Sequence, residues 1–150
     1  MKKALLAAAA IAVFSGSAYA ERYVMVTHTQ GTDPFWPVVE KGAKDAAEAL
    51  GVELEYNFAP SGDMADMAAL IEAAAATQPD GIIVSLPDAD ALGGAITSTV
   101  DSGIPVVTSN ASVPVSDCVT NVNQSDKLMM KGIVDKFSAD MGGKPEGDVI

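Results

Sequence analysis

Short apolar runs alternate with longer amphipathic stretches along most of the chain. Five runs rich in β-branched residues predict β-strands, at Tyr23–Thr27, Val52–Tyr56, Gly81–Ser85, Pro105–Ser109 and Cys118–Val122. Four stretches between or after them repeat apolar residues at helical spacing and predict helices, at Pro34–Leu50, Asp63–Thr77, Ala89–Ser102 and Ser125–Met141.

The repeated strand–helix order predicts an α/β fold with a doubly wound parallel sheet, because each helix provides the crossover that parallel strands need. The strands are almost wholly apolar, as expected where helices cover both faces of a sheet. In the first helix, the predicted core face consists of Val38, Val39, Gly42, Ala46, Ala49 and Leu50. In the second, it consists of Met64, Met67, Ala68, Ile71 and Ala75.

The N-terminus has the pattern of a cleavable signal peptide over residues 1–20. Lys2 and Lys3 precede the apolar run Ala4–Phe14, and Ala18 and Ala20 are the small residues that a signal peptidase requires. A run of about 11 residues is too short to cross a bilayer, which takes about 20. We therefore expect export to the periplasm, a mature chain that starts at Glu21, and no membrane insertion after the signal is removed.

The amino-acid composition argues against some classes of binding partner and against some kinds of site. Without Lys2 and Lys3, seven basic residues remain against 20 acidic ones, a formal charge of −13. Such a balance argues against nucleic acid and against anionic membrane surfaces as partners. Cys118 is the only cysteine, which excludes a disulfide framework or a thiolate metal cluster within one chain. Its apolar setting predicts a buried core thiol.

Candidate ligand-binding residues come from the loops after the predicted strands, since open parallel sheets bind ligands at the carboxyl ends of their strands. In the first loop, Phe35 and Trp36 offer flat apolar faces on which the C–H side of a sugar ring can stack, with core packing as the alternative. Asp33 is both a helix cap and a candidate ligand contact. His28 is a weaker candidate, because a lone histidine is more often structural.

Two further loops carry polar candidates. Asn110 follows the fourth strand, and its amide can both donate to and accept from sugar hydroxyls, with a turn role as the alternative. Asp88 and Asp90 stand at the start of the third helix, where N-capping accounts for at least one of them. Asp88 is kept as a candidate contact.

Enzyme signatures are missing from the sequence. It has no glycine-rich phosphate loop, no dinucleotide fingerprint, no Gly-x-Ser-x-Gly elbow and no His/Cys metal spacing. We therefore expect neither catalysis nor a cofactor or metal. A pair of carboxylates that meet across a cleft leaves a secreted glycoside hydrolase open as an alternative.

Three segments carry a family resemblance. The runs Asp33–Ala47, Pro79–Val84 and Ser102–Val107 resemble, in order and spacing, periplasmic sugar-binding proteins of the ribose-binding-protein-like class, which are related to LacI-type sensor domains. Such proteins are substrate-binding components of ABC transporters. The resemblance implies a type I periplasmic binding protein lobe, with residues 21–147 as the N-terminal lobe and 148–150 as the start of a strand in a second, truncated lobe.

The resemblance also implies a function. Two lobes joined by a hinge close on a sugar or polyol, and the closed monomer docks on an ABC permease of the inner membrane. It implies sugar contacts from Asp33, Phe35, Trp36 and the end of the fourth strand. That end reads Asn110-Ala111 instead of the Asp-Arg of ribose binders, so we expect another sugar or a polyol. A sensor that presents a ligand such as autoinducer-2 to a membrane receptor is the alternative.

Overall fold

A computed structural model describes residues 19–28, 33–112, 118–123 and 125–143. Nearly all of the expected signal peptide and the expected strand at 148–150 lie outside these residues, so both stay predictions. The described part folds around one parallel sheet of five strands in the order β2-β1-β3-β4-β5. The strands are β1 (Arg22–Thr27), β2 (Glu53–Phe58), β3 (Gly81–Leu86), β4 (Val106–Ser112) and β5 (Thr120–Val122).

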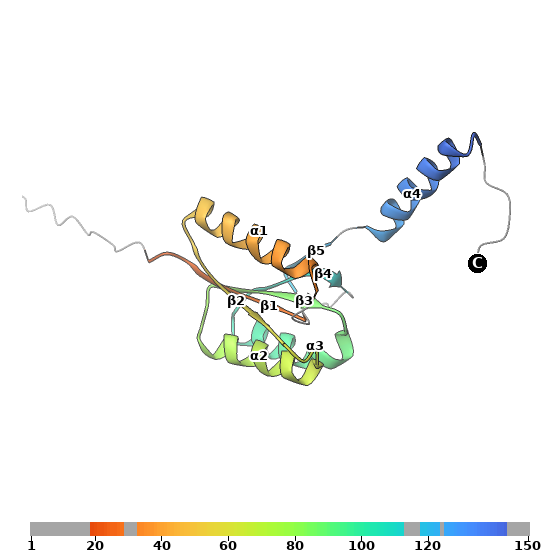
Figure 1. Cartoon of the computed structure of the whole chain (residues 1–150). Helices are drawn as coiled ribbons and strands as arrows, with labels where there is room; N and C mark the ends of the chain where they lie inside the picture. Colours follow the sequence, from red (N-terminus) through yellow and green to blue (C-terminus); the bar gives the residue numbers. More distant parts are fainter. Residues whose placement is uncertain (1–18, 29–32, 113–117, 124, 144–150) are drawn as a thin grey trace, which may run out of the picture.

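Helices cover both faces of the sheet, which confirms the predicted doubly wound α/β fold. Figure 1 shows α1 (Phe35–Leu50) on one face and α2 (Met64–Ala76) with α3 (Ala89–Asp101) on the other. The chain runs from β1 outward to β2 and then returns past β1 to β3, β4 and β5. The order therefore reverses between β1 and β3, and this switch point is where such sheets bind ligands.

The main core lies between the sheet and the α2/α3 layer. Met67 and Ile71 of α2 are fully buried there, and Met64, Ala68 and Ala75 pack against the same cluster. The predicted core face of α2 is thus confirmed. The remaining buried members are Val24, Val26, Ala59, Ala74, Ile82, Val84, Leu86, Leu92, Ala95, Ile96, Ile104 and Val106.

The predicted core face of α1 is wrong at five of its six residues, since only Val39 is half-buried and the others are exposed. Val38 and Leu50 are 71% and 77% exposed, whereas Trp36 and Ala47 are the buried residues of the helix. Trp36 packs in the first turn of the helix against the rings of His28 and Phe35, and the buried residues of α1 thus differ from the apolar stripe read from the sequence. In an alanine-rich helix that stripe is poorly defined, because small side chains suit either face.

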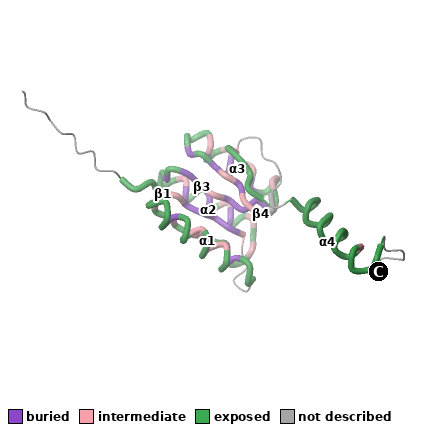
Figure 2. Tube along the Cα trace, turned by 90° about the horizontal axis from the view of Figure 1, so that it is seen from above, coloured by how far each residue is buried: buried purple, intermediate pink, exposed green. Residues whose placement is uncertain are grey.

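The last described helix stands apart from the sheet layers. α4 (Asp126–Asp140) projects away beyond β5 in Figure 1, and Figure 2 shows it exposed along its length. It has no buried residue, and its apolar side chains, Phe137 and Ile133 among them, are about half exposed. The layered body of the described residues is therefore β1 to β5 with α1, α2 and α3.

Candidate functional site

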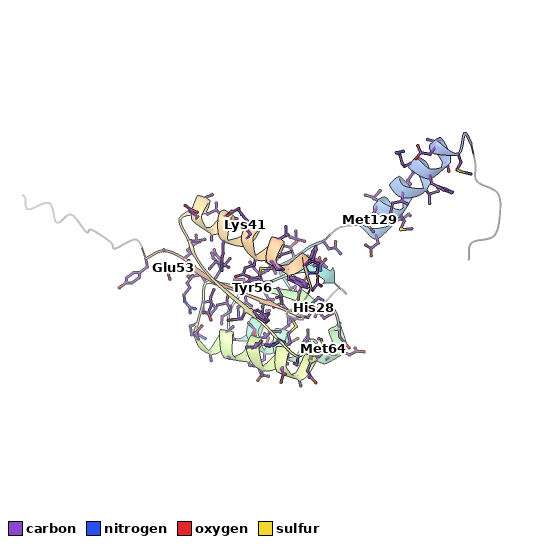
Figure 3. All side chains as sticks on the ribbon, viewed as in Figure 1. His28, Lys41, Glu53, Tyr56, Met64 and Met129 are labelled. Carbon is purple, nitrogen blue, oxygen red and sulfur yellow. The ribbon has the colours of Figure 1, made fainter. Side chains whose placement is uncertain are left out.

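Three neighbouring strands bring polar residues to one edge of the sheet. His28 follows β1, Ser85 lies near the end of β3, and Asn110 lies near the end of β4. Because β3 pairs with both β1 and β4, these residues come from adjacent positions at the carboxyl edge. The first turn of α1 begins at the same edge and adds Phe35 and Trp36. Figure 3 shows His28 at this end of the sheet.

His28 is held by a serine that the sequence did not single out. Its backbone N–H donates to Oγ of Ser85 at 3.0 Å, and its Nδ1 lies 2.7 Å from the same oxygen. Partial burial lowers the pKa of His28 below its usual 6.5, and the nearby carboxylate of Asp33 opposes that shift. The histidine is therefore biased toward its neutral form. A polar residue that ends an otherwise apolar strand was the available sequence signal for Ser85.

The two aromatic candidates differ in exposure. Trp36 is 4% exposed and its ring meets those of His28 and Phe35 edge-on, at centroid distances of 5.0 and 5.1 Å. Phe35 is 48% exposed. In this structure Trp36 has the packing role given above as its alternative, and Phe35 presents the accessible ring. A sugar contact for either residue stays a prediction.

Asp33 prepares the start of α1. Its Oδ1 accepts a hydrogen bond from the backbone N–H of Phe35 at 2.8 Å, although the N-cap position of α1 itself is Pro34. The residue is exposed, so its carboxylate is accessible to solvent. Asp33 can thus fix the first turn of α1 and bind a hydroxyl group at once.

Asn110 has an unusual backbone. Its φ of 54° lies in the left-handed region, where a residue other than glycine is uncommon and asparagine is among the best tolerated. The β3/β4 register shifts at this point, from Ser85 opposite Ser109 to Leu86 opposite Ser112. Asn110 therefore sits in a bulge at the end of β4. Bulges of this kind re-aim side chains and are frequent beside functional sites.

Asp88 acts mainly as a helix cap. Its Oδ1 accepts from the backbone N–H groups of Asp90 and Ala91, both at 3.0 Å, and satisfies two of the free donors at the start of α3. The N-capping interpretation is therefore confirmed for one of the two aspartates. A ligand contact for Asp88 remains a prediction.

The described residues hold no group of three or more His, Cys, Asp or Glu side chains that could bind a metal ion. Cys118, expected as a buried core thiol, is only half-buried and packs against the main core. A search for long apolar helices in the same residues found none able to span a membrane.

Comparison with known families gives a match over residues 23–150 to the family described as "Periplasmic binding protein domain". The chain belongs to this family of periplasmic binding proteins. Membership of this family implies a periplasmic location. The family consists of solute-binding proteins and not of enzymes, so the glycoside-hydrolase alternative is set aside.

Solved structures support the same family. The domain is 30% identical to AraP, an arabinose-binding protein from Geobacillus stearothermophilus (TM-score 0.76, 83% of this chain and 42% of that one). It is equally similar in sequence to GanP, a glucose-galactose binding protein from the same organism (30%, TM-score 0.72, 83% and 44%). A carbohydrate transporter from Acidothermus cellulolyticus 11B, solved with myo-inositol, also matches (30%, TM-score 0.69, 81% and 43%).

The 150-residue chain thus spans less than half the length of these relatives. A comparison with curated protein sequences gave no significant match.

Proposed function

We propose that this periplasmic binding protein captures an uncharged sugar or polyol between two lobes and delivers it to an ABC importer. The observation that carries the proposal is that an exposed aromatic ring, an amide and a histidine all belong to the carboxyl edge of β1, β3 and β4. Relatives that are 30% identical are described as arabinose-binding and glucose-galactose binding, which supports the same class of ligand.

Each candidate has a role that its chemistry supports. Phe35 offers the exposed face on which the C–H side of a sugar stacks, and Trp36 packs edge-on behind it. Asn110 both donates and accepts, which suits vicinal hydroxyl groups, while Asp33 accepts from one of them. Asp88 contributes chiefly by holding the start of α3 in place.

The charge at this edge favours an uncharged ligand. The loop segments 28–34, 59–63, 87–90 and 110–119 contain no Lys or Arg, while the aspartates among them include Asp33, Asp63 and Asp88. A phosphate or carboxylate on the ligand would meet only like charge from this half of the site. Sugar phosphates and uronic acids should therefore bind much more weakly than neutral sugars.

Closure and delivery are inferred from the family. Hinge closure around a ligand is the usual motion of periplasmic binding proteins. This chain spans less than half the length of those relatives, so the second lobe and the docking on a permease are part of the proposal.

Isothermal titration calorimetry of the purified protein, including any sequence beyond residue 150, tests the proposal. The panel is neutral pentoses, hexoses, inositols and autoinducer-2, with a sugar phosphate and a uronic acid as charged controls. We expect one neutral sugar or polyol to bind and the charged controls to give no heat. A folded protein that binds only autoinducer-2 would point to signalling, and tight binding of a charged control would contradict the electrostatic argument.

A further inference from the structure

The contact between Ser85 and His28 determines which ring nitrogen carries the proton. Oγ of Ser85 is within hydrogen-bond distance of both the backbone N–H and Nδ1 of His28, at 3.0 and 2.7 Å. Ser85 is fully buried, so water cannot satisfy its hydroxyl group. A buried hydroxyl proton needs an acceptor, because leaving it unpaired costs free energy.

Among the described residues, Nδ1 of His28 is the acceptor within reach of that hydroxyl. The backbone N–H of His28 can only donate, so Oγ of Ser85 accepts this hydrogen bond through one of its lone pairs. The hydroxyl proton of Ser85 is then free to form a hydrogen bond to Nδ1. Nδ1 then accepts, and in a neutral imidazole the ring proton must be on Nε2. The lowered pKa of His28, which partial burial causes, favours that neutral ring at physiological pH.

The ring is also held in orientation. Trp36 meets it edge-on, with an angle of 77° between the ring planes, and Ser85 anchors the Nδ1 side. His28 remains partly exposed, and within the described part of the chain Nε2 has no hydrogen-bond partner. A fixed N–H donor is therefore left available at the edge where β1 and β3 end (Figure 3).

We propose that Ser85 is a positioning residue that holds His28 as an Nε2–H donor to an acceptor oxygen of the bound ligand, and that His28 thereby contributes to ligand specificity. This inference rests on the proposed function of the same site. It predicts that a ligand with an oxygen at the position facing His28 binds about tenfold more tightly than its deoxy analogue, the effect of one added hydrogen bond.

The proton position can be observed directly by long-range ¹⁵N–¹H NMR of protein labelled at histidine. His28 is the sole histidine of the 150-residue sequence, and the spectrum of a His28→Phe variant confirms its assignment. We expect Nδ1 without a proton and Nε2 with one at neutral pH. Ser85→Ala should give a mixture of the two tautomers, and Ser85→Thr, which keeps the hydroxyl group, should restore the wild-type pattern.

Calorimetry with the neutral sugar that binds the wild type tests the ligand contact. We expect His28→Phe to weaken binding about tenfold and Ser85→Ala to weaken it by a smaller factor, with Ser85→Thr close to wild type. Ser98→Ala removes an exposed hydroxyl group on α3 and is the matched control, with unchanged affinity. Circular dichroism establishes that each variant is folded.

The outcomes separate this inference from the proposed function. A wild-type spectrum with the proton on Nδ1, or a Ser85→Ala variant with wild-type tautomer and affinity, would overturn the positioning role. Wild-type affinity of folded His28→Phe would overturn the ligand contact even though a sugar binds. If no neutral sugar binds the folded wild type, the proposed function fails first and the ligand contact falls with it.

Discussion

Asn110 combines a left-handed backbone conformation, which is uncommon for residues other than glycine, with a side chain suited to sugar hydroxyl groups. The sequence indicated the side chain, since Asn110 follows an apolar strand, but it could not indicate the left-handed φ or the bulge. Both depend on how β4 pairs with β3, and the register shift between them is visible only in the assembled sheet. Residues in uncommon backbone conformations are frequent at functional sites, where their side chains are needed in a particular direction.

Replacements of Asn110 should separate stability from binding. Glycine adopts positive φ without a steric penalty, whereas alanine pays about 1 kcal/mol or more. We therefore expect Asn110→Ala to have a lower free energy of unfolding than Asn110→Gly by about 1 kcal/mol, measured by urea denaturation, although both variants lose the amide and bind sugar more weakly. Equal stability of the two variants would show that the φ of 54° does not hold in solution.

The protonation of His28 should make stability depend on pH. Burial lowers its pKa in the folded protein below the usual 6.5, so the unfolded chain binds a proton at a higher pH than the folded one. The stability contributed by the neutral ring is complete above about pH 6.5 and is lost as the pH falls through the folded pKa.

Urea denaturation at pH 8 and pH 5 measures this contribution. Wild type should lose more free energy of unfolding over that interval than His28→Phe, because carboxyl groups affect both proteins alike. The same loss in the two proteins would mean that His28 has an ordinary pKa when folded.

At the scale of single elements, the ends of helices were more predictable than their faces. Asp88 or Asp90 was expected to cap α3, and Asp88 does so by accepting from two backbone N–H groups. Gly51 directly follows α1 and takes the left-handed conformation that favours glycine at the end of a helix. Caps depend on local chemistry, which a sequence carries, whereas the buried face of a helix depends on what packs against it.

Loss of the Asp88 cap should destabilise α3. Asp88→Ala should lower the free energy of unfolding by about 1 kcal/mol, the usual value of an N-cap side chain, and Asp88→Asn should restore most of it. Thermal and urea unfolding measure both. If Asp88→Asn is stable but binds sugar more weakly, the carboxylate also contacts the ligand; unchanged stability of Asp88→Ala would contradict the capping role.

Truncation of an apolar side chain to alanine should affect stability less in α1 than in α2. Leu50 of α1 is largely exposed, so Leu50→Ala should change the free energy of unfolding by less than about 0.5 kcal/mol. Ile71 of α2 is fully buried, and Ile71→Ala should cost about 2–5 kcal/mol. A large loss for Leu50→Ala would mean that the apolar stripe read from the sequence does pack in solution.

At the scale of the whole molecule, the alternation of elements was enough to predict the fold class. Strand spacing, apolar strands and intervening helices leave few topologies other than a doubly wound parallel sheet. The alternation of elements could not predict the contact between Ser85 and His28, because these residues are 57 positions apart and come together only when β1 pairs with β3. The sequence also could not predict that α4 stands apart from the sheet, since its apolar residues have the same helical spacing as those of the packed helices.

We propose that a neutral sugar binds against the exposed ring of Phe35 at the switch point of the sheet. The most direct test is calorimetry of one neutral sugar with wild type and with Phe35→Ala, a variant at a half-exposed position that should fold normally. We expect wild type to bind and Phe35→Ala to bind at least tenfold more weakly, equivalent to about 1.4 kcal/mol. Equal affinity of the two proteins, or no binding of any neutral sugar by the folded wild type, would contradict it.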